Sequence, residues 1–324
     1  MSDLIAVENL EKSFPVRGGL LTRTRHLVQA VRGVTLRVEE GETLGIVGES
    51  GCGKTTLGRV ILRLIPPTSG QVLFKGGDVA TLQGASLKEF RSRVQMIFQD
   101  PFASLNPRMT VGEIVAEPLV IHGRIAKKER RERVAALLRQ VGLLPDHQDR
   151  YPHEFSGGQR QRIGIARAIS LGPELIVADE PVSSLDVSVA FQILELLKEL
   201  KGIGFLFIAH DLRMVRYMSR RIAVMYLGKI VELLPREKFD QPLHPYTRHL
   251  MAAVPSAKPR GRGPRVGIAG EVPSPVSPPA GCSFHPRCPF AEGRCKIEEP
   301  LLREWRPGHW AACHLVDETE RKPL

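Results

Sequence analysis

A glycine-rich segment, Gly48-Glu49-Ser50-Gly51-Cys52-Gly53-Lys54-Thr55, matches the pattern G-x-x-x-x-G-K-[ST] at every position. Glycines let backbone N–H groups turn inward around a phosphate, and the N-terminus of a following helix adds partial positive charge. The lysine of such a loop reaches the β- and γ-phosphates, and the threonine hydroxyl can ligate Mg²⁺. We therefore expect residues 48–56, up to and including Thr56, to bind a nucleoside triphosphate.

Two acids follow a second apolar run. Leu175 to Ala178 predicts a buried strand that leads into Asp179 and Glu180. The carboxyl ends of parallel strands line the ligand crevice of an α/β sheet. Asp179 is expected to hold Mg²⁺ through water, and Glu180 to polarise the attacking water as general base. Taken alone, the same pattern also fits a buried strand followed by a surface turn.

Between these two elements lies Phe155-Ser156-Gly157-Gly158-Gln159-Arg160-Gln161-Arg162. This segment is a turn that opens a helix, and a helix N-terminus is an anion site. An ordinary phosphate-loop kinase or GTPase needs no second site of this kind.

The segment resembles the signature of ATP-binding cassette (ABC) proteins, which closes over ATP held by the opposite subunit. The resemblance covers roughly residues 4 to 254 and rests on further motifs in the same order. It implies an aromatic platform for adenine, a glutamine loop that also reaches Mg²⁺, a D-loop and a switch histidine. These are Phe14, Gln99 in Phe98-Gln99-Asp100-Pro101, Asp186 in Ser183-Ser184-Leu185-Asp186, and His210. With Glu180, Gln99 and His210 form the implied catalytic set.

The periodicity predicts an α/β fold. Strands are expected around Val34–Val38, at Thr43–Val47 and at Gly204–Ala209. A helix is expected from Lys54 to the stop at Pro66-Pro67, and another at about residues 191–200. Residues 100–170 are mainly helical in pattern, with a stripe formed by Val134, Leu137, Leu138 and Val141. Strands alternating with helices imply a parallel sheet covered on both faces. The resemblance adds an antiparallel N-terminal part and makes the helical segment an insertion.

The chain changes in character after about Glu237, and Ser256 to Pro279, which is rich in Pro, Gly, Ser and Arg, predicts a loop or linker. Three segments resemble the C-terminal extension of bacterial dipeptide/oligopeptide importer ATPases: 241–247, 270–275 and 281–289. We therefore expect an ATPase domain at 4–254, with its helical insertion at about 100–170, and a small cysteine-containing extension at 255–324. Nickel and other solutes are carried by close relatives of that branch.

The resemblance also implies partners. A second, related ATPase subunit would form a heterodimer with this one, beneath two transmembrane permease subunits supplied by an extracytoplasmic substrate-binding protein. The chain has no apolar run long enough for a bilayer and no export signal at its start. It is therefore expected at the cytoplasmic face of the membrane, as a peripheral subunit.

Two other classes of function require sequence features that this chain lacks or has not lost. The net charge of +11 fits nucleic acid, a membrane face or phosphate ligands. Basic runs such as 127–133 are interleaved with acids, which indicates a solvated helix face, and we expect no nucleic-acid partner. A soluble cassette ATPase acting on DNA or ribosomes would need a long coiled-coil insertion or two cassettes in one chain. A regulatory nucleotide binder without turnover would have lost Glu180 or His210.

Four of the five cysteines lie near the C-terminus, at Cys282, Cys288, Cys295 and Cys313. A reducing compartment disfavours disulfides. Zinc sites usually contain at least one C-x₂₋₄-C pair, and this chain has none, which argues against zinc. Four thiolates suit an iron–sulfur cluster, and importer ATPases with such a tail include members with a 4Fe–4S cluster. The expectation is a structural 4Fe–4S cluster. Four free thiols, or zinc completed by His285, His309 or His314, are the alternatives.

Overall fold

The computed structural model describes residues 3–17, 25–253 and 270–316. The chain divides into two compact units. Unit 1 comprises Met1–Ile5, Val38–Thr43 and Leu73–Ile208, and unit 2 comprises Ala6–Arg37, Leu44–Val72 and Ala209–Leu324.

Unit 1 contains three parallel strands. They are β6 (Val94–Ile97), β7 (Leu175–Asp179) and β8 (Gly204–Ile208), with Val94 opposite Leu175 and Leu175 opposite Gly204. Every residue of β7 and β8 is buried. Continuous burial explains why these strands are apolar at successive positions instead of alternating, as strands covered on both faces are. The predicted strands at 175–178 and 204–209 are thus confirmed within one residue.

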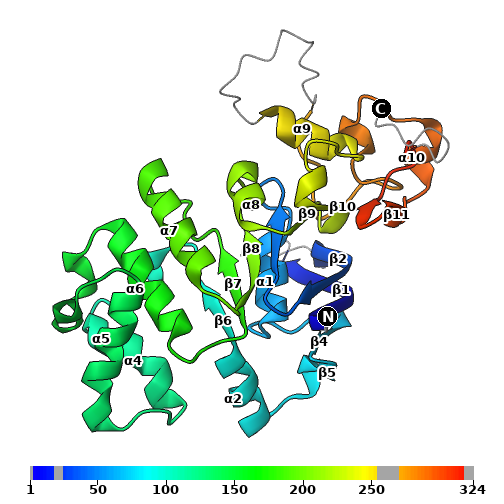
Figure 1. The fold of residues 1–324 in the computed structure, drawn as a ribbon. Coiled ribbons are helices and arrows are strands. Elements are labelled where there is room, and N and C mark those ends of the chain that lie inside the picture. Colours follow the sequence, from blue (N-terminus) through cyan, green and yellow to red (C-terminus); the bar gives the residue numbers. More distant parts are fainter. Residues whose placement is uncertain (1–2, 18–24, 254–269, 317–324) are drawn as a thin grey trace. The chain divides into compact units, whose positions relative to one another are not determined.

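Helices dominate the rest of unit 1, as the pattern at 100–170 predicted. In Figure 1 α4, α5, α6 and α7 lie together, and α4, α5 and α6 contact one another. The predicted stripe at 134–141 is buried. Thr110 and Glu113 form a capping box that starts α4. The helices are α2 (Gly84–Arg93), α3 (Pro101–Ser104), α4 (Val111–Ile121), α5 (Arg130–Gln140), α6 (Gly157–Ile169) and α7 (Val187–Glu199), with 3₁₀ turns η1 (Val79–Thr81), η2 (Lys127–Glu129), η3 (Pro145–Asp149) and η4 (Pro152–Glu154).

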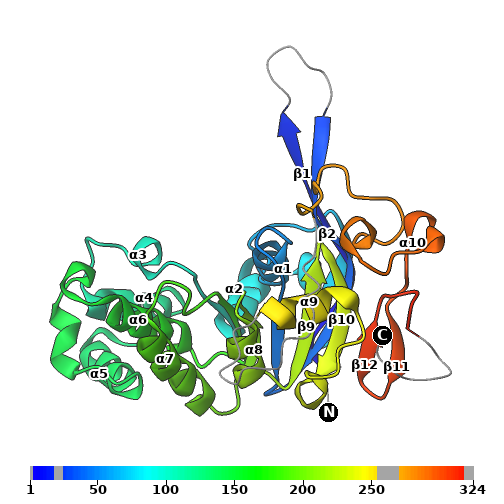
Figure 2. The same cartoon turned by 90° about the horizontal axis from the view of Figure 1, so that it is seen from above.

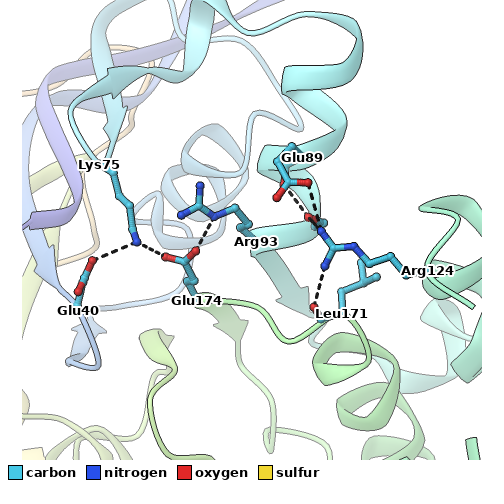
Figure 3. Close-up of polar contacts among 8 residues, drawn as sticks. Glu40, Lys75, Glu89, Arg93, Arg124, Leu171 and Glu174 are labelled. Atoms are coloured by element: carbon cyan, nitrogen blue, oxygen red, sulfur yellow. Dashed lines mark hydrogen bonds and ion pairs between the residues drawn. The ribbon is translucent and has the colours of Figure 1, made fainter. Parts of the chain in front are cut away.

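A network of ion pairs and hydrogen bonds surrounds Glu174, the residue that precedes β7 (Figure 3). Glu174 pairs with Arg93, the last residue of α2, and with Lys75 at 2.6 Å. Lys75, between β4 (Ser69–Phe74) and β5 (Gly77–Asp78), also pairs with Glu40 at 3.2 Å. Arg124 links α2 to the end of α6 in the same view. Because these side chains are part-exposed, they orient the strand more than they stabilise it.

Unit 2 is built on a sheet that the C-terminal segment extends. β3 (Thr43–Val47) runs parallel to β9 (Arg221–Tyr226), and β10 (Lys229–Pro235) runs antiparallel to β9. β12 (His309–Ala311) pairs with β10, and β11 (Arg303–Arg306) pairs with β12. Figure 2 shows this order from β9 to β11. The predicted strand at 43–47 is confirmed, whereas nothing in the residue pattern predicted the hairpin β11–β12.

The remaining elements of unit 2 include β1 (Asp3–Arg17) and β2 (Arg25–Glu39). The first residues of β1 and the last residues of β2 belong to unit 1. With β4 they are successive neighbours in a second sheet, in the order β2-β1-β4. The predicted strand at 34–38 lies within β2. The helices are α1 (Lys54–Ile61), α8 (Leu212–Met218), α9 (Pro245–Ala253) and α10 (Gly293–Ile297), with 3₁₀ turns η5 (Arg236–Lys238) and η6 (His285–Arg287).

One predicted boundary is wrong. The helix that begins at Lys54 ends at Ile61, before Pro66-Pro67. Arg63 adopts a φ of +51° and Leu64 N bonds back to Arg59 O at 2.9 Å, so the chain turns off the helix axis. Leu64 is consequently 50% exposed instead of continuing the apolar face.

The predicted linker at 256–279 lies largely outside the described residues. Among the helices that are described, none combines the length and the apolar composition needed to cross a bilayer.

Candidate functional site

The phosphate-loop residues lie in unit 2, between the end of β3 and the start of α1. Two glycines allow the tight path of the loop. A Cβ on Gly48 would lie 2.1 Å from Met225 O, and a Cβ on Gly53, whose φ is +106°, would lie 2.0 Å from Ala30 O. No side chain fits at either position, so backbone packing enforces the loop shape.

Lys54 closes the loop on itself. Its side chain is buried, and Nζ donates to Gly48 O at 2.7 Å and to Glu49 O at 3.0 Å. The ammonium therefore sits within the loop, at the N-terminal end of α1, where a phosphate would find both charge and N–H donors. Cys52 is buried beside it, and burial raises the pKa of its thiol, which favours the uncharged form.

Thr55 and Thr56 occupy the first turn of α1 and are partly buried. Phe14, the expected adenine platform, is also partly buried, and Lys12 Nζ lies 5.0 Å from the centroid of its ring. His210 is exposed and precedes Asp211, which caps α8. Unit 2 thus contains the phosphate-loop segment and the residues expected to act as the adenine platform and the switch histidine.

Unit 1 brings two of the expected catalytic residues into contact. Gln99 Nε2 donates to Glu180 Oε2 at 3.0 Å, although 81 residues separate them. Asp179 is buried at the end of β7 and Glu180 follows it with a φ of +45°. The left-handed backbone costs free energy for a residue other than glycine, and Glu180 N donates to Ile208 O at 2.8 Å, which holds this conformation.

The signature segment opens α6. Ser156 is the N-cap, and Ser156 and Gln159 bond reciprocally through side chains and backbone N–H groups. A Cβ on Gly158 would lie 2.4 Å from Val189 Cγ1, so α6 and α7 approach closely here. Gly157 has room, since its nearest neighbour would be a Leu185 methyl at 3.4 Å.

Asp186, the expected D-loop residue, caps α7 beside the signature. Its carboxylate accepts from Val189 N at 3.0 Å and Ser188 Oγ at 2.8 Å. These two hydrogen bonds lower the pKa of Asp186, so it stays ionised. Unit 1 therefore contains the residues expected to form the glutamine loop, the signature and the D-loop, together with Asp179 and Glu180.

The structure does not support the predicted 4Fe–4S cluster or its zinc alternative. All four C-terminal cysteines are free, and the described residues contain no group of three or more His, Cys, Asp or Glu side chains that could hold a metal ion. Burial raises the pKa of Cys282 to about 11 and of Cys313 to about 12, so both side chains are uncharged thiols in the metal-free chain.

The three histidines considered for zinc have other partners. His309 Nε2 pairs with Glu232 Oε1 at 2.7 Å, His285 Nδ1 contacts Cys282 O at 3.0 Å, and His314 Nε2 contacts Glu298 O at 2.9 Å. Each thus has a ring nitrogen engaged by protein oxygen.

Three residues with important contacts could not be identified from the sequence. Arg287 and Tyr246 both contact Glu49 of the phosphate loop, and Glu232 is a fully buried carboxylate that accepts from Leu243 N and His244 N. In the sequence, Glu232 has the pattern of a solvent-facing polar residue on an edge strand, so its burial could not be predicted. No spacing in the sequence relates Glu49 to Arg287, which lies 238 residues away.

Unit 2 also has a cavity of about 750 Å³ between β2, β10 and the C-terminal segment, lined among others by Arg32, Lys229, Phe284 and Trp310. Cys282 is the only predicted site residue on its wall, so this cavity is separate from the phosphate loop.

Comparison with known families gives two matches. Residues 31–183 match the family model described as ABC transporter. Residues 231–295 match that of the oligopeptide/dipeptide transporter C-terminal region.

The chain is 52% identical over 319 residues to the oligopeptide transport ATP-binding protein AppF of Bacillus subtilis, covering 96% of this chain and 97% of that one. It is also 52% identical over 320 residues to a probable peptide ABC transporter ATP-binding protein of Sinorhizobium fredii, covering 97% and 91%. Among solved structures, the ATP-binding cassette MJ0796, a dimer bound to ADP and Pi in a post-hydrolysis state, matches with a TM-score of 0.64 and 30% identity. That match covers 72% of this chain and 98% of the other.

Proposed function

The chain belongs to the ABC transporter family of ATPases, and we propose that it hydrolyses ATP to drive the import of dipeptides or oligopeptides. The observation that carries the hydrolytic part is the contact between Gln99 and Glu180, which joins an amide and a carboxylate at the end of β7. The peptide cargo rests on the C-terminal region matched at 231–295 and on relatives named for peptide transport.

We assign the roles as follows. Lys54 and the loop 48–53 hold the phosphates of ATP, and Phe14 stacks on adenine. Glu180 is the general base for the attacking water, with Gln99 and His210 orienting the reacting groups. The cap of α6, Ser156 to Gln159, and Asp186 face the nucleotide of a second subunit.

Mg²⁺ fits the donor set of this chain. Thr55, Asp179 and Gln99 offer hydroxyl, carboxylate and amide oxygens, the hard donors that Mg²⁺ prefers. Asp179 is buried at the carboxyl end of β7, the end of a parallel strand where ligand-binding residues lie, and this position supports its role in holding Mg²⁺. When bound, Mg²⁺ neutralises charge that develops on the β- and γ-phosphates.

We further propose the domain limits and the assembly. The ATPase domain spans 4–254 and the extension spans 255–324. A second ATPase subunit, two transmembrane permease subunits and an extracytoplasmic substrate-binding protein complete the importer, which places this chain at the cytoplasmic face of the membrane. No nucleic acid takes part.

Glu180→Gln tests the hydrolytic assignment. The amide keeps the shape of the side chain but cannot accept the proton, so turnover should fall about 10²–10⁴-fold while ATP binding persists. Glu199→Gln is the matched control, because Glu199 is an exposed carboxylate on α7. Turnover of the Glu180→Gln variant within twofold of the control would reject Glu180 as the base.

Cargo is tested in cells that express the complete transporter. Uptake of a labelled dipeptide and of a labelled pentapeptide should depend on Glu180, with the Glu180→Gln transporter as the inactive reference. Uptake of Ni²⁺ in the same cells, with no uptake of either peptide, would replace the peptide assignment by metal import.

A further inference from the structure

Glu49, the second residue of the phosphate loop, is held by two residues from the C-terminal part of the chain. Arg287 Nη1 donates to Glu49 Oε2 at 2.8 Å and Nη2 donates to Oε1 at 3.1 Å, which makes a bidentate pair. Glu49 N donates to Tyr246 Oη at 2.9 Å. The carboxylate and the amide of one loop residue are therefore both engaged from outside the loop.

These contacts are partly withdrawn from water. The side chain of Arg287 is 9% exposed and that of Glu49 is 25% exposed. The pairing raises the pKa of Arg287, with the hydrogen bonds to Glu49 as the leading cause. An ion pair with this geometry and burial is worth more than an exposed one.

A buried aromatic cluster supports both residues. The rings of Tyr226, Tyr246 and Phe284 are at most 1% exposed, with centroids 4.6 to 5.4 Å apart. Phe284 immediately precedes η6, which carries Arg287, and the guanidinium carbon of Arg287 lies 5.9 Å from the Tyr226 ring centroid. The cluster fixes the place from which Arg287 and Tyr246 reach the loop.

The same loop residue also contacts Lys54, whose Nζ donates to Glu49 O at 3.0 Å. A free carboxylate on this loop would repel a triphosphate and compete for the lysine ammonium. Arg287 neutralises that carboxylate, and Tyr246 accepts from the Glu49 N–H and so fixes the backbone that carries the carbonyl to Lys54.

We propose that Arg287, in the C-terminal extension, and Tyr246, in α9 at the end of the ATPase domain, are positioning residues that set the ATP affinity of the phosphate loop. The proposal rests on the assignment of this loop as the ATP site. Neither residue touches the nucleotide in this scheme. Arg287 acts by neutralising Glu49, and Tyr246 acts by holding its backbone.

The test is MgATP affinity, measured by titration calorimetry on the full chain. Arg287→Gln leaves the Glu49 carboxylate uncompensated and should weaken binding about tenfold, the order expected for one unpaired charge close to a polyanion. Glu49→Gln alone completes the double-mutant cycle and should bind MgATP more tightly than the parent, because it leaves the Arg287 charge uncompensated beside the loop. The double variant Glu49→Gln/Arg287→Gln should recover to within about threefold of the parent, because the repelling charge has gone.

The rescue separates neutralisation from mere structural support. If the extension only stabilises the fold, Glu49→Gln does not restore the affinity lost with Arg287, and the proposal is overturned. Arg294→Gln is the matched control, since Arg294 makes a bidentate pair with Glu298 in the same extension but on its surface. Unchanged affinity in Arg287→Gln also overturns the proposal.

Tyr246→Phe tests the backbone contact. It keeps the ring in the cluster and removes the acceptor of Glu49 N, so affinity should fall about three- to tenfold. Glu49→Gln should not rescue this variant, because the lost bond involves the backbone; an unchanged affinity contradicts the role of Tyr246.

Lys54→Ala, measured alongside, distinguishes failure of this proposal from failure of the ATP-site assignment. If Lys54→Ala binds MgATP as the parent does, the loop itself is misassigned. If it loses binding while Arg287→Gln and Tyr246→Phe do not, only the positioning role fails.

Discussion

Acidification is expected to destabilise unit 2 through His244. This side chain is 1% exposed, and burial lowers its pKa from 6.5 to about 4, with a smaller opposing effect from Glu232 and a smaller lowering effect from Arg248. Nδ1 accepts a hydrogen bond from Tyr246 N at 3.1 Å, which a protonated nitrogen cannot do. The ring also packs against Phe284, with centroids 5.7 Å apart.

The sign and size follow from linkage. Between pH 6.5 and pH 4 the unfolded chain binds a proton at His244 that the folded chain does not, so stability falls as the pH falls through this window. At pH 5 the difference between a pKa of 6.5 and one of about 4 lowers the free energy of unfolding by about 2 kcal/mol relative to pH 8. Above pH 7 His244 contributes no pH dependence.

The measurement is urea denaturation at pH 8 and at pH 5 for the parent and for His244→Asn. Asparagine offers an amide oxygen to Tyr246 N and has no titrating group, so its loss of stability between the two pH values should be smaller by about 2 kcal/mol. Comparing the two chains cancels the contributions of all other titrating groups. Equal losses in parent and variant would refute the argument.

Three further outcomes are expected. Glu232→Ala strands two backbone N–H groups and His309 in a buried setting, and urea denaturation should show a loss of about 3–5 kcal/mol, with a loss below 1 kcal/mol contradicting the role of the carboxylate. Gly158→Val should lower the melting temperature, because a Cβ at this position would lie 2.4 Å from Val189 Cγ1. Gly164→Ala, on the same helix, should not lower it, because a Cβ there has no atom within 4 Å. Equal melting temperatures of the two variants would refute the steric argument. Ser156→Arg should leave ATP binding by the isolated chain intact and block the ATP-dependent dimer in size-exclusion chromatography; a normal dimer would show that the cap of α6 does not face a second subunit.

Local features that depend on a few neighbouring residues could be predicted from the sequence alone. The phosphate-loop pattern, the apolar run before Asp179 and Glu180, and the glycines at the start of α6 identify a strand–loop–helix unit, a strand end and a helix cap. Each depends on local backbone chemistry, such as glycine conformations, capping and unbroken apolar runs. For the same reason β3, β7 and β8 could be predicted within one residue.

Contacts between distant segments required the tertiary structure. Gln99 meets Glu180 across 81 residues, and Glu49 meets Arg287 across 238, because packing of buried strands and of the aromatic cluster brings their segments together. The end of α1 depends on the backbone of Arg63 rather than on the prolines that follow.

The cysteines show that residue types and spacing do not suffice to predict a metal site. Their types and spacing predicted a metal cluster, but whether four thiols form a ligand set depends on burial and on the direction of each side chain. Burial raises the pKa of Cys282, Cys288 and Cys313 and so favours their thiol forms in the metal-free chain, and His309 pairs with Glu232 on β10. These energies arise from the surroundings of a side chain, which the order of residues does not specify.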